Sequence, residues 1–65
     1  MTREELVADG LVDVGDAESF TGLKKSKLYQ LMESGELPFV TLGRRRLIPR
    51  RALVQLAADN LHGVS

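Results

Sequence analysis

The chain has 65 residues, no cysteine, and nine lysines and arginines balanced by nine aspartates and glutamates, so its net charge at pH 7 is zero. A chain of this length builds one domain with a small core, and the lack of cysteine excludes disulfides and thiolate metal sites. Its one histidine, His62, argues against a zinc site. No apolar run approaches the roughly 20 residues of a membrane span, and the N-terminus lacks a signal-peptide pattern. We therefore expect a soluble, cytoplasmic protein without metal or cofactor.

The charges are distributed unevenly along the chain. Residues 1–22 carry one cation and six carboxylates, whereas residues 23–51 carry eight cations and two carboxylates. The molecule is therefore an electrical dipole, in which the cationic segment suits a polyanion such as DNA and the acidic segment faces elsewhere. We interpret the acidic residues as a solvated face or a protein contact, because no histidine lies near them in the sequence to complete a metal or catalytic cluster.

The first ten residues are expected to form a short helix. Thr2 and Glu5 have the spacing of a capping box, and Gly10 supplies a stop, so residues 3–9 are expected to make one or two helical turns. Leu11 and Val12 then form a short extended piece.

A second helix is expected from Asp13 to Thr21. Asp13 is a suitable N-cap, and Ala17 and Phe20 are spaced to lie on one face of this helix. Gly22 then turns the chain.

A third, amphipathic helix is expected over residues 25–34. Leu28, Leu31 and Met32 recur at the spacing of one helical face, which we expect to be buried, leaving the opposite face exposed. Gly35 ends the helix.

Two β-prone runs at residues 39–42 and 47–48 flank a Gly-Arg-Arg-Arg segment, a pattern that predicts a β-hairpin with an arginine-bearing tip. Because side chains alternate along a strand, Arg44 and Arg46 face away from Arg45. We expect Arg44 and Arg45 at the tip, and Arg46 is open to pairing with an acidic neighbour.

The last helix is expected over residues 50–60, after Pro49, and is expected to close the core. Its apolar side is formed by Leu53, Leu56, Ala57 and Leu61.

Arg50 and Arg51 open this last helix, the end at which the helix dipole disfavours cations. Two explanations remain open. Either phosphate lies close to them, or they form salt bridges with the acidic N-terminal segment.

The third helix has the side chains that a DNA recognition helix needs near its N-terminus. Lys25, Ser26 and Lys27 are short polar or cationic residues that reach base edges. Tyr29 and Gln30 follow one turn later, where a hydroxyl meets phosphate and an amide pairs with adenine. Tyr29 is equally consistent with half-buried packing, and the lysines alone are also consistent with a solvated face.

The arginine-bearing tip complements this helix. An arginine at a narrow hairpin tip fits the minor groove, where the negative potential is strongest over A-tracts. A protein that holds two grooves at once favours bent DNA.

Four motifs in order along the chain resemble the excisionase and AlpA-like branch of the MerR-type winged-helix superfamily. The resemblance covers roughly residues 13–58. It implies a small α+β winged helix-turn-helix fold with a two-stranded β-hairpin wing and a closing C-terminal helix. The motifs are Thr21-Gly22-Leu23, Leu28-Tyr29, Gly35-Glu36-Leu37-Pro38 and Gly43-Arg44-Arg45-Arg46-Leu47-Ile48.

The resemblance also implies roles for individual segments. Residues 25–34 become the recognition helix in the major groove, and Arg44, Arg45 and Arg46 become the wing. The family often has Ser or Thr as the cap before the recognition helix, where this chain has Lys24. That departure weakens the cap by about 1 kcal/mol, but it places a cation beside the phosphate backbone.

Family members are DNA-binding modules of phages and mobile elements. The resemblance implies a recombination directionality factor that binds attachment-site DNA in several copies, bends it and helps a tyrosine integrase excise a prophage. The alternatives are a transcriptional regulator of a phage or mobile-element promoter, and a small adapter whose basic stretch meets an acidic protein. The chain lacks the long C-terminal dimerisation helix of MerR-type regulators, which favours the first hypothesis over the second.

We divide the chain into a short N-terminal helix or arm (1–10), a winged-helix domain (11–61) and a tail (62–65). The charge asymmetry predicts head-to-tail self-association on DNA, with the acidic residues 4–18 of one copy against the basic segment of the next. We expect no enzymatic activity, because the sequence has no nucleophilic cysteine, no Gly-rich phosphate loop and too small a core for a substrate pocket. Neither a membrane nor a small-molecule substrate is expected as a partner.

Overall fold

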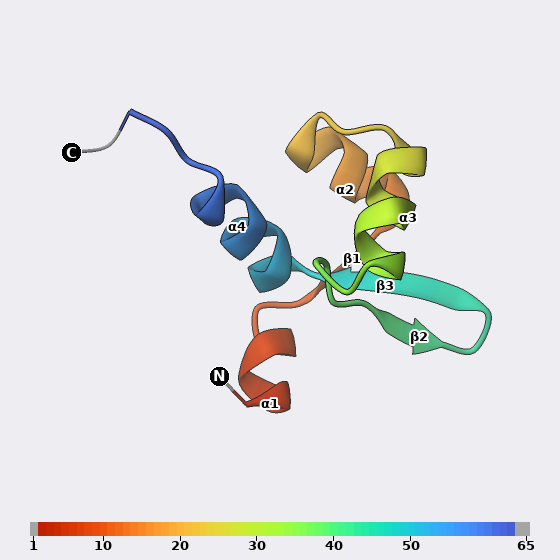
Figure 1. Cartoon of the computed structure of the whole chain (residues 1–65). Coiled ribbons are helices and arrows are strands. Elements are labelled where there is room, and N and C mark those ends of the chain that lie inside the picture. The colour runs from red at the N-terminus through yellow and green to blue at the C-terminus, as the bar shows by residue number, and fades with distance from the viewer. Residues whose placement is uncertain (1, 64–65) are drawn as a thin grey trace.

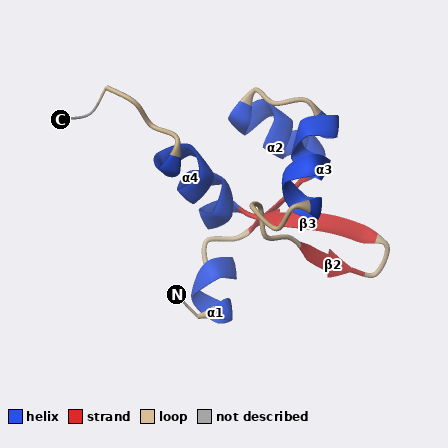
Figure 2. Ribbon diagram, in the orientation of Figure 1, coloured by secondary structure: helices blue, strands red, loops and turns tan. Residues whose placement is uncertain are grey.

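The computed structural model describes residues 2–63, which form four helices and a three-stranded antiparallel sheet (Figure 1). The strand order is β1-β3-β2, so β3 is central. Figure 2 shows β2 and β3 side by side. This architecture confirms the predicted small α+β winged helix-turn-helix fold. In chain order the elements are α1 (Arg3–Val7), β1 (Leu11–Asp13), α2 (Val14–Thr21), α3 (Lys25–Glu33), β2 (Val40–Leu42), β3 (Arg45–Pro49) and α4 (Arg50–Asp59).

The N-terminal helix α1 is capped as the sequence predicts. The Glu5 N–H donates to Thr2 Oγ1 at 3.1 Å. The helix is shorter than the expected range 3–9, and its last residue is Val7. Gly10, at φ +99°, then turns the chain into β1, and its carbonyl accepts a hydrogen bond from the Arg50 N–H at 2.9 Å.

Strand β1 has a larger role than the extended piece predicted from Leu11 and Val12. It pairs with β3 in antiparallel register, with Val12 opposite Ile48. The wing hairpin is therefore part of a three-stranded sheet. A third strand matters physically, because an isolated two-stranded hairpin is only marginally stable in water.

Helix α2 begins and ends where its caps predict. The Asp16 N–H donates to Asp13 Oδ1 at 2.7 Å, and Gly22 ends the helix in the left-handed region at φ +75°. Of the two residues expected on one face, Ala17 is fully buried, whereas Phe20 is 50% exposed at the edge of that face. With 3.6 residues per turn, Phe20 comes six residues after the buried Val14 and lies about 120° from it around the helix axis.

The turn between α2 and α3 is held by Thr21. Its hydroxyl donates to the Ala17 carbonyl at 2.7 Å and accepts from the Leu23 N–H at 3.1 Å. Helix α3 then buries Leu28 and Met32, and it ends at Glu33, one residue before the predicted end. The hydrogen bonds of Thr21 therefore fix the direction of α3 relative to α2.

Beyond α3 the chain folds back over the end of the helix. The Leu37 N–H donates to the Leu31 carbonyl at 3.0 Å, and Leu37 is fully buried, whereas Leu31 is only partly buried against the core. Leu37 is a core residue that helical periodicity did not identify, because it lies outside every helix.

The β2–β3 register sets the tip of the hairpin. Leu42 pairs with Arg45, so Gly43 and Arg44 form a two-residue turn with Gly43 at φ +62°, the first-position glycine that a type II′ turn requires. The expectation that Arg45 lies at the tip is therefore wrong. Arg45 is the first residue of β3, and Arg44 alone of the three arginines lies in the turn.

The core lies between the helices and one face of β3. Helix α4 contributes Ala52 and Leu53, with Leu56 partly buried against them. The predicted burial of Ala57 and Leu61 is wrong, since both are exposed and Leu61 lies beyond the end of the helix. In Figure 1 the C-terminal end of α4 projects past the other elements, and Leu56 is the last residue of the helix that packs against the core. The buried set is Val14, Ala17, Leu28, Met32, Leu37, Ile48, Ala52 and Leu53.

None of the helices within residues 2–63 combines the length and the apolar character needed to span a bilayer. The division into an arm (1–10), a winged-helix domain (11–61) and a tail (62–65) stays a prediction. Met1 of the arm and residues 64–65 of the tail lie outside the described part of the chain.

Candidate nucleic-acid interface

The polar residues at the start of α3 lie on its exposed side. Lys24 is the N-cap residue and makes no side-chain capping hydrogen bond, as expected from a lysine at this position. Lys25, Ser26 and Lys27 follow in the first turn of the helix, and all are exposed. The buried Leu28 and Met32 fix the rotation of α3, so these polar side chains face solvent.

Tyr29 and Gln30 lie one turn further along α3 and are also exposed. Tyr29 is 40% exposed, and its ring centroid lies 5.3 Å from Arg46 Cζ. The packing role that the sequence left open is thus present, because one part of the Tyr29 ring lies against an arginine, and the accessible part leaves a DNA contact as a prediction.

The hairpin presents its three arginines in three different environments. Arg44 lies in the exposed turn. Arg45 is 70% exposed, with Nη2 3.9 Å from Asp13 Oδ2. Arg46 points toward α3, where its Nη1 lies 3.5 Å from Glu33 Oε1. The alternative pairing expected for Arg46 is thus present.

The two arginines that open α4 also differ from each other. The Arg51 Nε donates to Asp9 Oδ2 at 2.9 Å, so Arg51 forms a salt bridge with the acidic N-terminal segment. Arg50 uses its backbone N–H to bond Gly10, while its side chain lines a surface hollow with Asp16 and Phe20.

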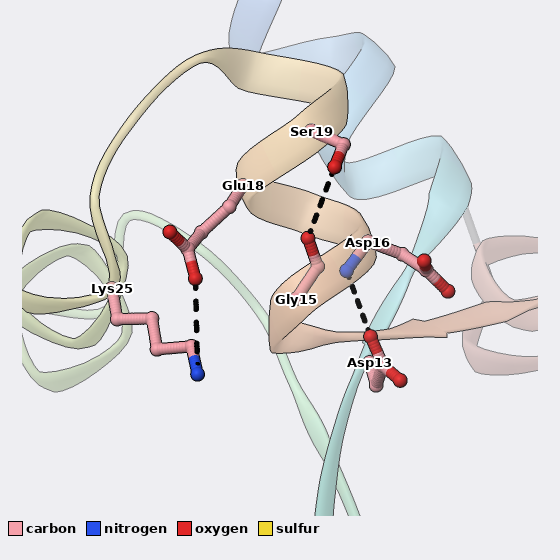
Figure 3. A network of polar contacts seen from close by, with 6 residues as sticks. All are labelled: Asp13, Gly15, Asp16, Glu18, Ser19 and Lys25. Carbon is pink, nitrogen blue, oxygen red and sulfur yellow. Dashed lines mark hydrogen bonds and ion pairs between the residues drawn. The ribbon is translucent and has the colours of Figure 1, made fainter.

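Four ion pairs within residues 2–63 each join a predicted DNA-contact residue to a carboxylate. They are Lys25–Glu18, Arg45–Asp13, Arg46–Glu33 and Arg51–Asp9. The Lys25–Glu18 pair, at 3.9 Å, spans α2 and α3 (Figure 3). The same range contains no ion-pair partner for four other predicted contacts, Lys24, Lys27, Arg44 and Arg50.

Three of these four cations, Lys24, Lys27 and Arg44, lie at the start of α3 and in the hairpin turn, and the fourth, Arg50, lies at the start of α4. In Figure 1 the start of α3 and the hairpin turn project toward the right of the view, away from α1 and from the C-terminal end of α4. Fully exposed cations keep their charge available for an external anion, whereas paired ones must first exchange a carboxylate. The arrangement presents two separate cationic contacts to a polyanion.

The order of elements around this surface is a helix, a tight turn, a second helix and a hairpin. Residues 11–60 match the sequence profile of a family described as helix-turn-helix domain. The chain belongs to this helix-turn-helix family. Within the family match, α2 and α3 are the helix pair and the Thr21-Gly22-Leu23 segment is the turn.

A relative from Saccharopolyspora erythraea, described as a probable excisionase, is 44% identical to this helix-turn-helix chain over 48 residues. That match covers 74% of the chain and 49% of the relative, so the chain spans about half the length of the relative. No solved structure matches the chain. The profile and the relative together confirm the resemblance stated from the motifs, and the chain is an excisionase-like helix-turn-helix DNA-binding protein.

Sequence reasoning did not assign the partners of the cations. Asp13, Glu18 and Glu33 were grouped by net charge, and nothing in linear spacing pairs Asp13 with Arg45 across the sheet. One signal was available for Glu33, which follows Tyr29 by four residues and so shares its helix face. Phe39, whose ring centroid lies 4.4 Å from Arg46 Cζ, was assigned only to a strand.

Proposed function

We propose that this protein is a DNA-binding accessory factor of site-specific recombination. Helix α3 enters the major groove of attachment-site DNA, and the Gly43–Arg44 turn enters the adjacent minor groove. Holding both grooves bends the DNA and assists a tyrosine integrase in excising a prophage. The observation that carries the proposal is the placement of exposed cations at Lys24, Lys27 and Arg44, for which residues 2–63 provide no ion-pair partner.

The proposal assigns each candidate residue a contact. Lys24, Lys27 and Arg44 neutralise phosphate or enter the minor groove, and Ser26 and Gln30 read base edges. Lys25, Arg45 and Arg51 reach phosphate by exchanging their carboxylate partners, and the solvent-facing part of Tyr29 lies against the backbone. Arg50, free of an ion pair within the described range, is a further phosphate contact.

The proposal includes several copies on one DNA. A single winged helix has a small footprint, so useful affinity and specificity require neighbouring copies. The acidic residues 4–18 of one copy lie against the basic segment of the next, a head-to-tail arrangement that does not close into a ring.

A circularly permuted gel shift tests this function on DNA fragments from the region flanking the gene. We expect stepwise, cooperative shifts whose mobility depends on the position of the site within the fragment. Arg44→Ala is the test variant and Arg3→Ala is its matched control. Each removes one exposed arginine, but Arg3 lies on α1, away from the proposed contacts. Arg44→Ala should weaken the shift and Arg3→Ala should not.

The other outcomes have definite meanings. A single shift that does not depend on site position would replace the architectural role with that of a promoter regulator. No shift at low salt would overturn DNA binding by this chain and favour the acidic-protein adapter. Strictly one copy per duplex at saturation would remove the head-to-tail assembly.

A further inference from the structure

We infer that Arg46 is a positioning residue that holds the β2–β3 wing at a defined angle to α3, and that it does not contact DNA. The inference rests on the proposed function, since that function needs α3 and the wing to reach two grooves together. It changes the role of one residue that the motif Gly43-Arg44-Arg45-Arg46 groups with the wing contacts.

Three groups surround the Arg46 guanidinium. Its Cζ lies 4.4 Å from the Phe39 ring centroid and 5.3 Å from the Tyr29 ring centroid, and Nη1 lies 3.5 Å from Glu33 Oε1. Tyr29 and Glu33 are four residues apart on α3 and therefore lie on one face of that helix. The guanidinium thus bridges α3 and the segment that leads into β2.

Arg46 lies at the right place along β3 to act in this way. Ile48, two residues later on the same face of the strand, is fully buried in the core. Arg46 therefore lies one pleat nearer the tip than the core residue Ile48, and there it contacts Tyr29 and Glu33 of α3. The next residues, Arg45 and the Gly43–Arg44 turn, are exposed.

The chemistry of the group suits a bridge better than a DNA contact. A planar guanidinium stacks on aromatic faces and pairs with a carboxylate at the same time, which an ammonium does less well. With Phe39, Tyr29 and Glu33 around it, the Arg46 side chain is only 32% exposed. To reach phosphate it would have to leave all three contacts.

Loss of the Arg46 contacts should change both the motion of the wing and the affinity for DNA. Without the bridge, the wing samples more orientations in the free protein, and binding both grooves must first restrict it. Affinity should then fall without any loss of counterion release, because no phosphate contact has been removed.

The test compares Arg46→Met with Arg44→Met in the full chain. The two variants lose the same charge and keep a similar apolar stem. Amide order parameters of Gly43 and Arg44 in the free protein report on the wing, and DNA affinity is measured as a function of salt concentration. We expect Arg46→Met to lower the order parameters and to weaken binding by about threefold to tenfold with the wild-type salt slope. Arg44→Met should keep the order parameters and reduce the slope by about 0.9.

Two further variants separate a positioning role from simple loss of charge or stability. Phe39→Leu leaves the Arg46 charge in place and removes a ring, so it should reproduce the increased wing motion and the weaker binding. Arg46→Lys keeps a cation near both rings and should recover part of the affinity.

The inference is overturned if Arg46→Met reduces the salt slope as Arg44→Met does, or if Phe39→Leu binds DNA like the wild type. Should Arg46→Met fail to fold, Phe39→Leu decides by the same readouts. If the wild type binds no DNA, the proposed function falls, while the order parameters of Gly43 and Arg44 still decide whether Arg46 restrains the wing.

Discussion

At the scale of single residues, the N-cap position of α3 holds a lysine, which adds a positive charge but cannot make the capping hydrogen bond that stabilises a helix. The first N–H groups of a helix lack intrahelical partners, and a Ser or Thr side chain at the N-cap normally accepts from one of them. Lys24 occupies that position, has extended backbone angles of φ −75° and ψ 159°, and makes no side-chain capping bond. The backbone is thus already arranged for a cap, and the side chain is instead a cation without an ion-pair partner in the described part of the chain.

We therefore expect Lys24→Ser to raise the free energy of unfolding by about 1 kcal/mol, since serine restores the cap. The same change should weaken DNA binding and reduce the salt slope by about 0.9, because one phosphate contact is lost. Urea denaturation and salt-dependent binding measure the two effects. Lys27→Ser is the control, since it removes a cation inside the helix and should weaken binding without stabilising the fold. An uncapped helix in Lys24→Ser, with unchanged stability, would contradict the argument.

Base reading is expected from a different kind of residue on the same helix. Gln30 is exposed on α3, and its amide can form a bidentate pair with adenine. Gln30→Ala should reduce affinity for the specific site by about tenfold while leaving affinity for random DNA nearly unchanged. Competition binding with specific and random duplexes measures the ratio. Equal losses on both duplexes would rule out base reading by Gln30.

At the scale of elements, the relation between α2 and α3 depends on the turn that joins them. Thr21 closes this turn with two hydrogen bonds from one hydroxyl, one to the end of α2 and one to the Leu23 N–H. Gly22, in the left-handed region, allows the sharp change of direction. The turn therefore fixes the direction of α3 relative to α2 through local contacts.

Thr21→Val keeps the shape of the side chain and removes both hydrogen bonds. Because the site is partly buried and the Leu23 N–H loses its acceptor, we expect the free energy of unfolding to fall by about 1–3 kcal/mol. Ser19→Ala is the matched control, since the Ser19 hydroxyl bonds the Gly15 carbonyl at 3.4 Å on the exposed side of the same helix. Chemical denaturation of both variants tests the difference, and equal effects would show that the turn is not held in this way.

At the scale of the whole molecule, acidic and basic segments that are separate in the sequence come together in space. Carboxylates from β1, from α2 and from the turn after α1 lie beside cations of β3, α3 and α4. A zero net charge thus coexists with a surface on which only some cations are free. The pairs are exposed and individually weak, so DNA phosphate can replace the carboxylates at little cost.

Removing one of these carboxylates should strengthen DNA binding. Glu18 Oε1 lies 3.9 Å from Lys25 Nζ, and Glu18→Gln frees that lysine, so we expect affinity for random DNA at low salt to rise by about threefold. Asp59→Asn makes the same change in net charge on the last residue of α4, where Asp59 accepts from Gln55, and it should have a smaller effect. Equal increases for the two variants would mean that net charge alone, and not the Lys25–Glu18 contact, governs affinity.

Much of the fold follows from local chemistry that is readable in the chain. The caps at Thr2 and Asp13, the turn at Gly22, and the buried pair Leu28 and Met32 depend on neighbours within a few residues, and each is present in the structure. The exposed positions of the α3 polar residues follow directly from the buried ones. These features are local, so sequence spacing predicts them.

What only the tertiary structure decided lies in contacts between segments distant in sequence. Three features depend on which surfaces meet in the fold: the pairing of β1 with β3, the burial of Leu37, and the exposure of Ala57 and Leu61. A periodic pattern of apolar residues in a helix does not show how far along the helix the packing partner extends. The same holds for Arg46, which the motif groups with the wing and the fold places against Tyr29, Phe39 and Glu33. The sequence by itself determined the helix-turn-helix and its exposed cations, because capping, turns and amphipathic spacing act locally. The fold determined which cations are free, because ion pairing depends on distance in space.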